Sequence, residues 1–140
     1  MKVLLAVDGS PFTERMLAYF AAHRELLAPG SQLTALTVVT NVPSHVTSFI
    51  EGGTLKQYYA EQAEEVLGPV RRLAEQHKLE ATYANAVGNP GEAIAKAAEQ
   101  GGYDLVVMGS HGHSALGSLV MGSVTSRVLA NCKTPLLIVR

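Results

Sequence analysis

The sequence predicts a single α/β domain over residues 1–140, built on a doubly wound parallel sheet. Short apolar runs recur along the chain, a helical pattern separates each run from the next, and the series ends on an apolar run. Strict alternation of strand and helix is typical of a parallel sheet with helices on both faces. A length of 140 residues also fits one domain.

A strand and a helix are predicted at the start of the chain. The apolar run KVLLAV, residues 2–7, suits a strand buried on both faces. Ser10 is a good helix cap, Pro11 suits the first helical position, and the proline and glycine at 29–30 end the pattern. The apolar residues at helical spacing between them are Phe12, Met16, Leu17, Phe20 and Leu27.

The middle of the chain contains a second strand, over about 33–40, and a long helix, over about 55–78. Residues 41–53 between them show no clear period, and their conformation is left open. Gly68 and Pro69 interrupt the helical stripe. We expect a kink or a short break there, because proline removes a backbone donor and clashes with the preceding turn.

The second half of the chain repeats the alternation. A third strand is predicted over about 81–87, and the helix that follows has Asn89 as its N-cap, Pro90 as its first residue and Glu92 as a first-turn carboxylate. The remaining elements are a fourth strand, a last helix and a fifth strand, at 104–108, 123–131 and 135–140.

The stretch GSHGHSALGSLVMGSV, residues 109–124, contains four glycines directly after the fourth strand, where ligands of open α/β sheets bind. Glycine lets a ligand approach main-chain N–H groups, and a helix that starts at Gly122 and Ser123 offers free N–H groups to an anion. Hydroxyls that can donate to phosphate or coordinate a divalent ion are those of Ser110, Ser114, Ser118, Ser123 and Thr125. The alternative that the spacing leaves open is a flexible surface loop.

The stretch does not match two familiar phosphate-binding motifs. A Walker-type loop requires a lysine followed by serine or threonine just after its last glycine, whereas Gly122 is followed by Ser123 and Val124. A dinucleotide fingerprint requires glycines two and then three residues apart after the first strand. Gly109 and Gly112 are three apart after the fourth strand.

The pattern does resemble another signature. Gly109, two residues, Gly112, nine residues, Gly122 and Ser123 match the nucleotide-binding signature of the ATP-binding branch of the universal stress protein family. VLLAVDGS, LTVVT, GNPGEAI, YDLVVMGSHG and TPLLIVR resemble further blocks of that family and extend the resemblance over nearly the whole chain. It implies an adenine nucleotide alpha hydrolase-like fold with strand order 3-2-1-4-5, four helices on both faces, and a homodimer.

The resemblance also implies which residues bind a nucleotide. Backbone groups of Val38 would meet adenine. The Asp8 carboxylate would repel phosphates, so we expect it to accept hydrogen bonds from ribose hydroxyls or the base; its alternative role is that of a helix-cap or turn carboxylate. The residues that would line the ribose and phosphates are Met108, Gly109, His111, Gly112, Gly122, Ser123, Val124 and Thr125.

The loop departs from the family in its charge. Relatives often have a basic residue just after the second glycine, where this sequence has His113, and no lysine or arginine lies between Lys96 and Arg127. The charge of ATP, ADP or AMP must then be offset by N–H groups, hydroxyls and a bound magnesium or manganese ion. We expect affinity to depend on that ion, and to rise as the pH falls through the imidazole range because His113 becomes cationic.

No protein metal ligand is predicted, apart from Ser123 through a nucleotide-bound ion. His111 and His113 have no cysteine, histidine or carboxylate nearby at zinc-ligand spacing.

Composition argues against several partners. The 11 lysines and arginines against 12 acidic residues leave no basic field for nucleic acid. Asp8 ends the first apolar run before it is long enough for a signal-peptide core or a membrane span, and no membrane partner is expected. A single cysteine, Cys132, agrees with a reducing compartment, so we expect a cytoplasmic protein.

The predicted function is that of a dimeric module that binds an adenine nucleotide and signals its bound state to unknown regulatory proteins during stress. No catalytic residue is assigned, because no serine, histidine and acid set and no suitable carboxylate pair is evident. The alternatives are a slow ATPase or autophosphorylating enzyme that uses the same loop, and an interaction dimer without nucleotide. The dimer is expected to form through the edge strand from Pro135 to Arg140, where unpaired backbone groups invite another strand.

Overall fold

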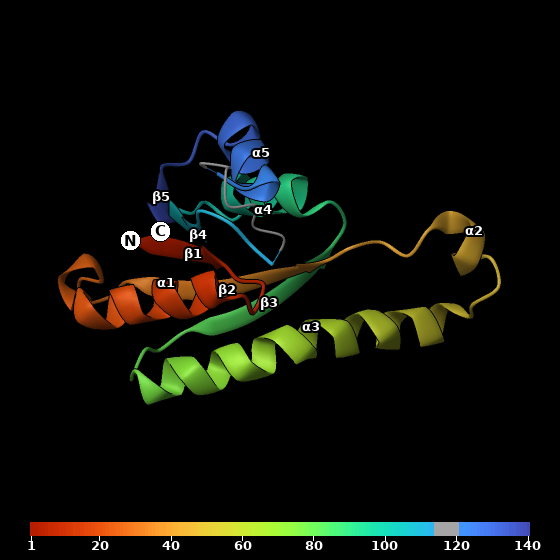
Figure 1. Ribbon diagram of the computed structural model, residues 1–140, viewed down its shortest axis with the longest axis horizontal. Helices are drawn as coiled ribbons and strands as arrows, with labels where there is room; N and C mark the ends of the chain where they lie inside the picture. The colour runs from red at the N-terminus through yellow and green to blue at the C-terminus, as the bar shows by residue number, and fades with distance from the viewer. Residues whose placement is uncertain (114–120) are drawn as a thin grey trace.

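The computed structural model contains a five-stranded parallel sheet covered by helices on both faces (Figure 1). It describes residues 1–113 and 121–140. The strands lie in the order β3-β2-β1-β4-β5, so the predicted fold class and strand order are confirmed. Their bounds are β1 (Lys2–Ala6), β2 (Gln32–Val39), β3 (Thr82–Val87), β4 (Leu105–Gly109) and β5 (Leu136–Val139).

The direction of winding reverses between β1 and β4, which are neighbours in the centre of the sheet. Val3 pairs with Leu105 and Leu5 with Val107, in parallel register. From β1 the chain passes to β2 and β3 on one side, and it returns through β4 to β5 on the other. Ligands of such sheets bind beyond the carboxyl ends of the two strands at the reversal.

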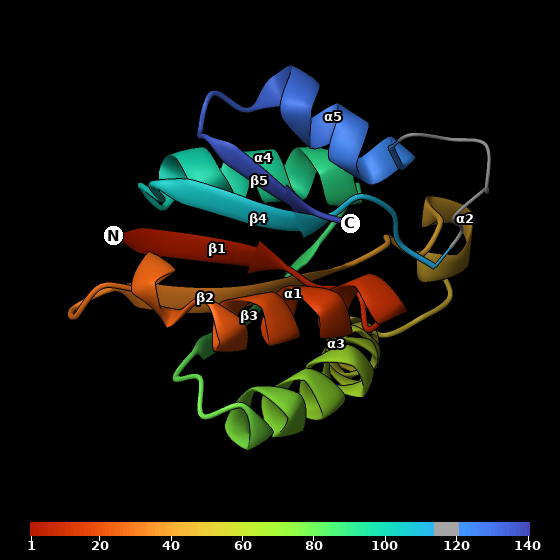
Figure 2. The ribbon, with the colours of Figure 1, turned by 60° about the vertical axis from the view of Figure 1, so that its left-hand side comes forward.

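Four helices form the two outer layers. They are α1 (Pro11–Ala22), α3 (Gly52–Gln76), α4 (Pro90–Gln100) and α5 (Ser123–Asn131). Figures 1 and 2 show α1 and α3 on one face of the sheet and α4 and α5 on the other. Each face has its own apolar core: Phe20 and Leu67 belong to the first, and Ile94 and Val128 to the second.

The segment whose conformation the sequence left open contains the short helix α2 (Ser44–Thr47) and the start of α3. Figure 1 shows α2 and the first turns of α3 extending beyond the sheet. Phe49 in this extension is 90% exposed. Residues 41–53 show no hydrophobic period because they pack on no continuous apolar surface.

The prediction for the first helix is wrong in its extent. α1 ends at Ala22 and not near residue 29, and a 3₁₀ turn follows it at Arg24–Leu26. Leu27 lies beyond that turn but still packs on the core of this face. Its apolar character therefore reflects burial and not membership of the helix.

Of the kink or short break expected at Pro69, the break does not occur: α3 runs through the proline as one helix of 25 residues. Buried residues lie on both sides of the proline, among them Leu67 and Val70. Packing of both halves on the same face of the sheet offsets the loss of one helical hydrogen bond.

The two predicted helix caps differ in outcome. Asn89 caps α4 as expected, since its Oδ1 accepts from the Glu92 N–H at 3.2 Å, with Pro90 as the first residue. Ser10 occupies the N-cap position of α1, but its side chain makes no capping hydrogen bond.

Candidate functional site

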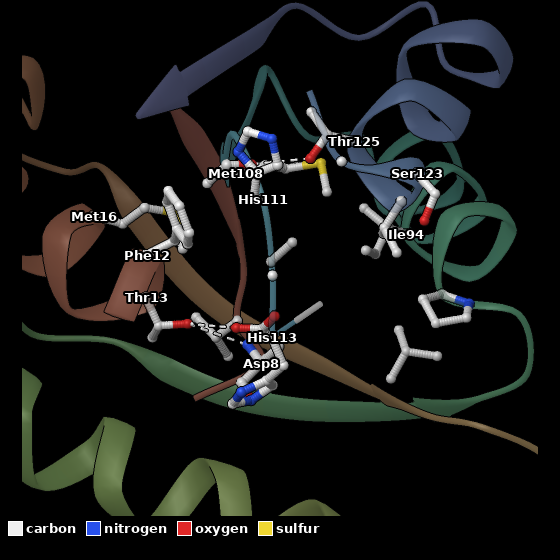
Figure 3. A pocket seen from close by; sticks show the side chains of 18 of the residues that line it. Asp8, Phe12, Thr13, Met16, Ile94, Met108, His111, His113, Ser123 and Thr125 are labelled. Carbon is white, nitrogen blue, oxygen red and sulfur yellow. Dashed lines mark hydrogen bonds between the residues drawn. The ribbon is translucent and has the colours of Figure 1, made fainter. Parts of the chain in front are cut away.

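A cavity of about 710 Å³ opens beyond the carboxyl ends of β1, β2 and β4. This volume lies within the range of small-molecule sites. All ten residues predicted to contact a nucleotide line it: Asp8, Val38, Met108, Gly109, His111, Gly112, Gly122, Ser123, Val124 and Thr125. Figure 3 shows Asp8 and Ser123 well apart across the open space. The sequence thus predicted residues that the fold brings together from β2, β4, α5 and the loops that follow β1 and β4.

One part of the cavity is apolar, and the sequence reasoning missed most of it. The additional lining residues include Phe12, Met16, Leu36 and Ile94. Apolar walls with a few polar groups suit a flat aromatic ligand. Phe12 and Met16 belong to the apolar stripe of α1, so only their place directly after β1 could have indicated contact with a ligand.

Three glycines lie where the chain passes close to other atoms. A Cβ on Gly109 would lie 2.5 Å from the Phe12 Cβ, and a Cβ on Gly112 would lie 2.5 Å from Asp8 Oδ2. A Cβ on Gly122 would lie 3.2 Å from the His111 Cα. The glycine pattern therefore permits the loop after β4 to pack against the loop after β1 and against the start of α5.

The start of α5 faces the cavity, and its hydrogen bonds correct one expectation. The Gly122 N–H donates to the Ser110 carbonyl at 2.6 Å, so this amide is not free for an anion. The amides that follow, of Ser123, Val124 and Thr125, belong to the first helical turn, where an α-helix has no internal acceptor for them. The anion-binding end of α5 therefore begins at Ser123.

The hydroxyl groups of the loop are less available than the sequence suggested. Thr125 is 3% exposed, and its Oγ1 donates to the Gly109 carbonyl at 2.9 Å. Its proton fixes α5 to the end of β4 and is not available to a phosphate. Ser110 is buried, and its Oγ lies 3.1 Å from His111 Nδ1. Ser114 and Ser118 lie outside the described residues.

Asp8 is held by the loop between β1 and α1, in which Gly9 has a φ of 76°. Its Oδ1 accepts from the Ser10 N–H at 2.9 Å and from Thr13 Oγ1 at 3.1 Å. The turn-carboxylate role that the sequence left open is thus present at Oδ1. Oδ2 is directed toward Gly112, and Asp8 also lines the cavity.

His113 joins the two loops at the edge of the cavity. Its Nε2 lies 2.7 Å from the Asp8 carbonyl oxygen, which can only accept, so Nε2 carries the proton. Figure 3 shows this ring beside Asp8 and away from His111. In residues 1–113 and 121–140, no group of three or more histidine, cysteine or carboxylate side chains could hold a metal ion.

The nearby arginines are engaged elsewhere. Arg15 lies over the ring of Phe12, 4.8 Å from its centroid. The stem of Arg127 occupies the space above Gly91, and its guanidinium lies 3.8 Å from Glu92. Neither arginine is among the described residues that line the cavity. Asp8 is thus the one acidic side chain of the described lining, which also contains two histidines and no lysine or arginine.

Comparison with known proteins identifies the family. The model of the universal stress protein family matches residues 1–140. The chain belongs to the universal stress protein family. The resemblance inferred from the glycine spacing is therefore confirmed at the level of the family.

Three relatives illustrate the range of this similarity. A universal stress protein of Thermus aquaticus is 35% identical over 138 residues, which are 99% of this chain and 97% of the relative. The solved structure of MJ0577 from Methanocaldococcus jannaschii has a TM-score of 0.79 at 28% identity and covers 99% of this chain and 94% of its own. The Archaeoglobus fulgidus universal stress protein in complex with dAMP has a TM-score of 0.70 at 21% identity. The match covers 100% of this chain and 98% of that one.

One further finding concerns membranes. No helix formed by the described residues of this universal stress protein has the length and the apolar character that crossing a membrane requires.

Proposed function

We propose that this universal stress protein binds an adenine nucleotide, namely ATP, ADP or AMP, in the cavity beyond β1 and β4. One observation carries the proposal: the ten residues that the family resemblance implies as nucleotide contacts all line a single cavity, which has an apolar part and a helix N-terminus. The dAMP complex of the Archaeoglobus fulgidus relative supports the same class of ligand.

Each part of the nucleotide has matching chemistry in the cavity. The apolar residues near Val38 suit the adenine ring, and a carboxylate oxygen of Asp8 suits a ribose hydroxyl, because a carboxylate accepts and never donates. The amides at the start of α5 suit phosphate oxygens, since the helix dipole favours negative charge there. A magnesium or manganese ion bound to the phosphates would supply the positive charge that the described lining lacks, with Ser123 as a further ligand.

The same observations favour binding over turnover. Phosphoryl transfer requires stabilisation of developing charge, and neither Arg15 nor Arg127 is among the described residues that line the cavity. The Thr125 hydroxyl donates its proton to Gly109, which makes it a poor phosphoryl acceptor. We therefore propose that the protein acts as a nucleotide-dependent module in the cytoplasm, regulating partner proteins during stress.

We also propose a homodimer joined through the strand from Pro135 to Arg140. β5 is an edge strand of the sheet, and an unpaired edge favours pairing with a second copy.

The binding proposal is tested by denaturing the purified protein and chromatographing the supernatant. The chain has no tryptophan and five tyrosines, so a bound nucleotide dominates the absorbance near its maximum. Protein freed of ligand is then titrated calorimetrically with ATP, ADP and AMP in magnesium buffer. Saturable binding of at least one of them is expected. A flat titration with all three, for a protein with a cooperative melting transition, would remove the proposal.

A further inference from the structure

Asp8 and Thr13 form a closed set of hydrogen bonds at the wall of the cavity. Thr13 Oγ1 lies 3.1 Å from Asp8 Oδ1, and it also accepts the backbone N–H groups of Asp8 and Gly9, each at 3.2 Å. Thr13 is 2% exposed and comes from the first turn of α1. Dashed lines in Figure 3 mark the contact between Thr13 and Asp8.

The hydroxyl of Thr13 has one orientation that satisfies all three contacts. A hydroxyl has one proton to donate and two lone pairs to accept. The two backbone amides occupy the lone pairs, because an N–H group can only donate. The proton is therefore directed to Asp8 Oδ1, which is an acceptor.

Fixing Oδ1 also fixes the other oxygen of the carboxylate. Oδ1 accepts from the Ser10 amide in the loop and from the Thr13 hydroxyl in the first turn of α1, so two donors hold the carboxylate against rotation. Oδ2 then lies on the side of Gly112, at a position 2.5 Å from where a Cβ on that residue would be. A side chain at residue 112 would meet this oxygen, whereas glycine leaves it accessible to a ligand in the cavity.

An oxygen presented in this way selects a particular kind of ligand group. A carboxylate repels phosphate and accepts from hydroxyls, and hydrogen bonds to charged groups are the stronger ones. The ribose diol is the part of a nucleotide that donates hydroxyl protons.

We propose that Thr13 is a positioning residue that aims Asp8 Oδ2 at the ribose diol and so makes the site selective for ribonucleotides over 2′,3′-dideoxynucleotides. This inference rests on the proposed binding of an adenine nucleotide. Thr13 acts only through Asp8 and does not itself contact the nucleotide.

The test compares ATP with 2′,3′-dideoxy-ATP by calorimetry in magnesium buffer, for wild type, Thr13→Val and Thr13→Ser. Valine keeps the shape of threonine without the hydroxyl, and serine keeps the hydroxyl. We expect wild type to prefer ATP about tenfold or more. Thr13→Val should bring the ratio of the two affinities, ATP over 2′,3′-dideoxy-ATP, close to one by weakening ATP binding alone. Thr13→Ser should restore the preference for ATP. If the role of Thr13 were purely structural, Thr13→Val would weaken the binding of both nucleotides equally.

A double-mutant cycle decides whether Thr13 works through Asp8. Asp8→Asn keeps an acceptor for Thr13 but replaces one carboxylate oxygen with an amide group. It should abolish the preference for ATP, and adding Thr13→Val should change the ratio no further. If Thr13→Val does not fold, Thr13→Cys, whose thiol is a weaker donor, takes its place with the same expected direction.

The outcomes separate the two proposals. If wild type binds none of ATP, ADP and AMP, the proposed function fails. If wild type binds ATP and 2′,3′-dideoxy-ATP equally, or if Thr13→Val retains the preference for ATP, adenine nucleotide binding stands and the role of Thr13 is overturned.

Discussion

The backbone N–H of Gly122 donates to the carbonyl oxygen of Ser110 at 2.6 Å, which joins the start of α5 directly to the end of β4. Thr125 makes a second connection between the same two elements through the Gly109 carbonyl. The first-turn amides of α5 are therefore held at a fixed place beyond the sheet. An anion site built from these amides requires little rearrangement when a ligand binds.

Replacing Gly122 with valine should lower the affinity for ATP at least tenfold. A Cβ at this position would lie 3.2 Å from the His111 Cα and 3.4 Å from the Ser110 carbonyl oxygen, so the start of α5 must move away from β4. Affinity is measured by calorimetry, and the melting transition shows whether the fold persists. Gly53→Val is the matched control, because a Cβ on Gly53 meets nothing within 4 Å. Undiminished ATP binding by folded Gly122→Val would show that these amides do not hold the phosphates.

The fold was predictable because its signals are local. The apolar runs at 2–7 and 104–108 form the two central strands, and Asn89 with Pro90 starts α4 as expected. The errors arose where tertiary packing decides. Leu27 has the spacing of a helical residue but packs from beyond a 3₁₀ turn, and Pro69 is tolerated because α3 is buried on both sides of it.

The site was predictable only in part. The glycine spacing identified the loop after β4 because close approach to other atoms excludes side chains there. Phe12 and Met16 were missed as lining residues, since an apolar residue on α1 has the same local pattern whether it meets the core or a ligand. The contact between Thr13 and Asp8 depends on the turn at Gly9, which no periodicity reveals.

Removal of magnesium should separate ATP from AMP. The described lining contains no lysine or arginine, so the charge of a triphosphate must be offset largely by a bound ion. The smaller charge of a monophosphate is nearer to what helix amides accommodate. We expect chelation of magnesium to weaken ATP binding about tenfold or more and AMP binding about twofold or less. Both are measured by calorimetry with and without EDTA. Equal effects on the two nucleotides would contradict the argument.

Replacing Ile138 with proline should weaken the proposed homodimer without breaking the sheet. The carbonyls of Pro135 and Val139 accept hydrogen bonds from β4. Backbone groups of successive residues in a strand point to opposite sides, so the N–H of Ile138, next to Val139, faces the free edge. Proline removes this outward donor and leaves the bonds to β4 in place. Light scattering at micromolar protein concentration should give a dimer mass for wild type and a lower mass for the variant. Leu137→Pro, at the position that faces β4, should instead unfold the strand. A monomer mass for wild type would count against the interface.

The pKa of Tyr83 should make stability depend on pH in the alkaline range. Partial burial of the phenol raises its pKa above the ordinary value; Arg71, 4.9 Å from the ring, opposes this and Glu75 adds to it. Between the pKa values of the unfolded and the folded chain, the folded state binds more protons, so the free energy of unfolding falls as the pH rises. The stabilisation is complete below a pH of about 10 and is lost above it.

Urea unfolding at several alkaline pH values should show a steeper loss of stability with pH for wild type than for Tyr83→Phe. Tyr58→Phe, which removes an exposed phenol, is the control. Parallel losses for wild type and Tyr83→Phe would mean that burial against α3 does not govern this titration.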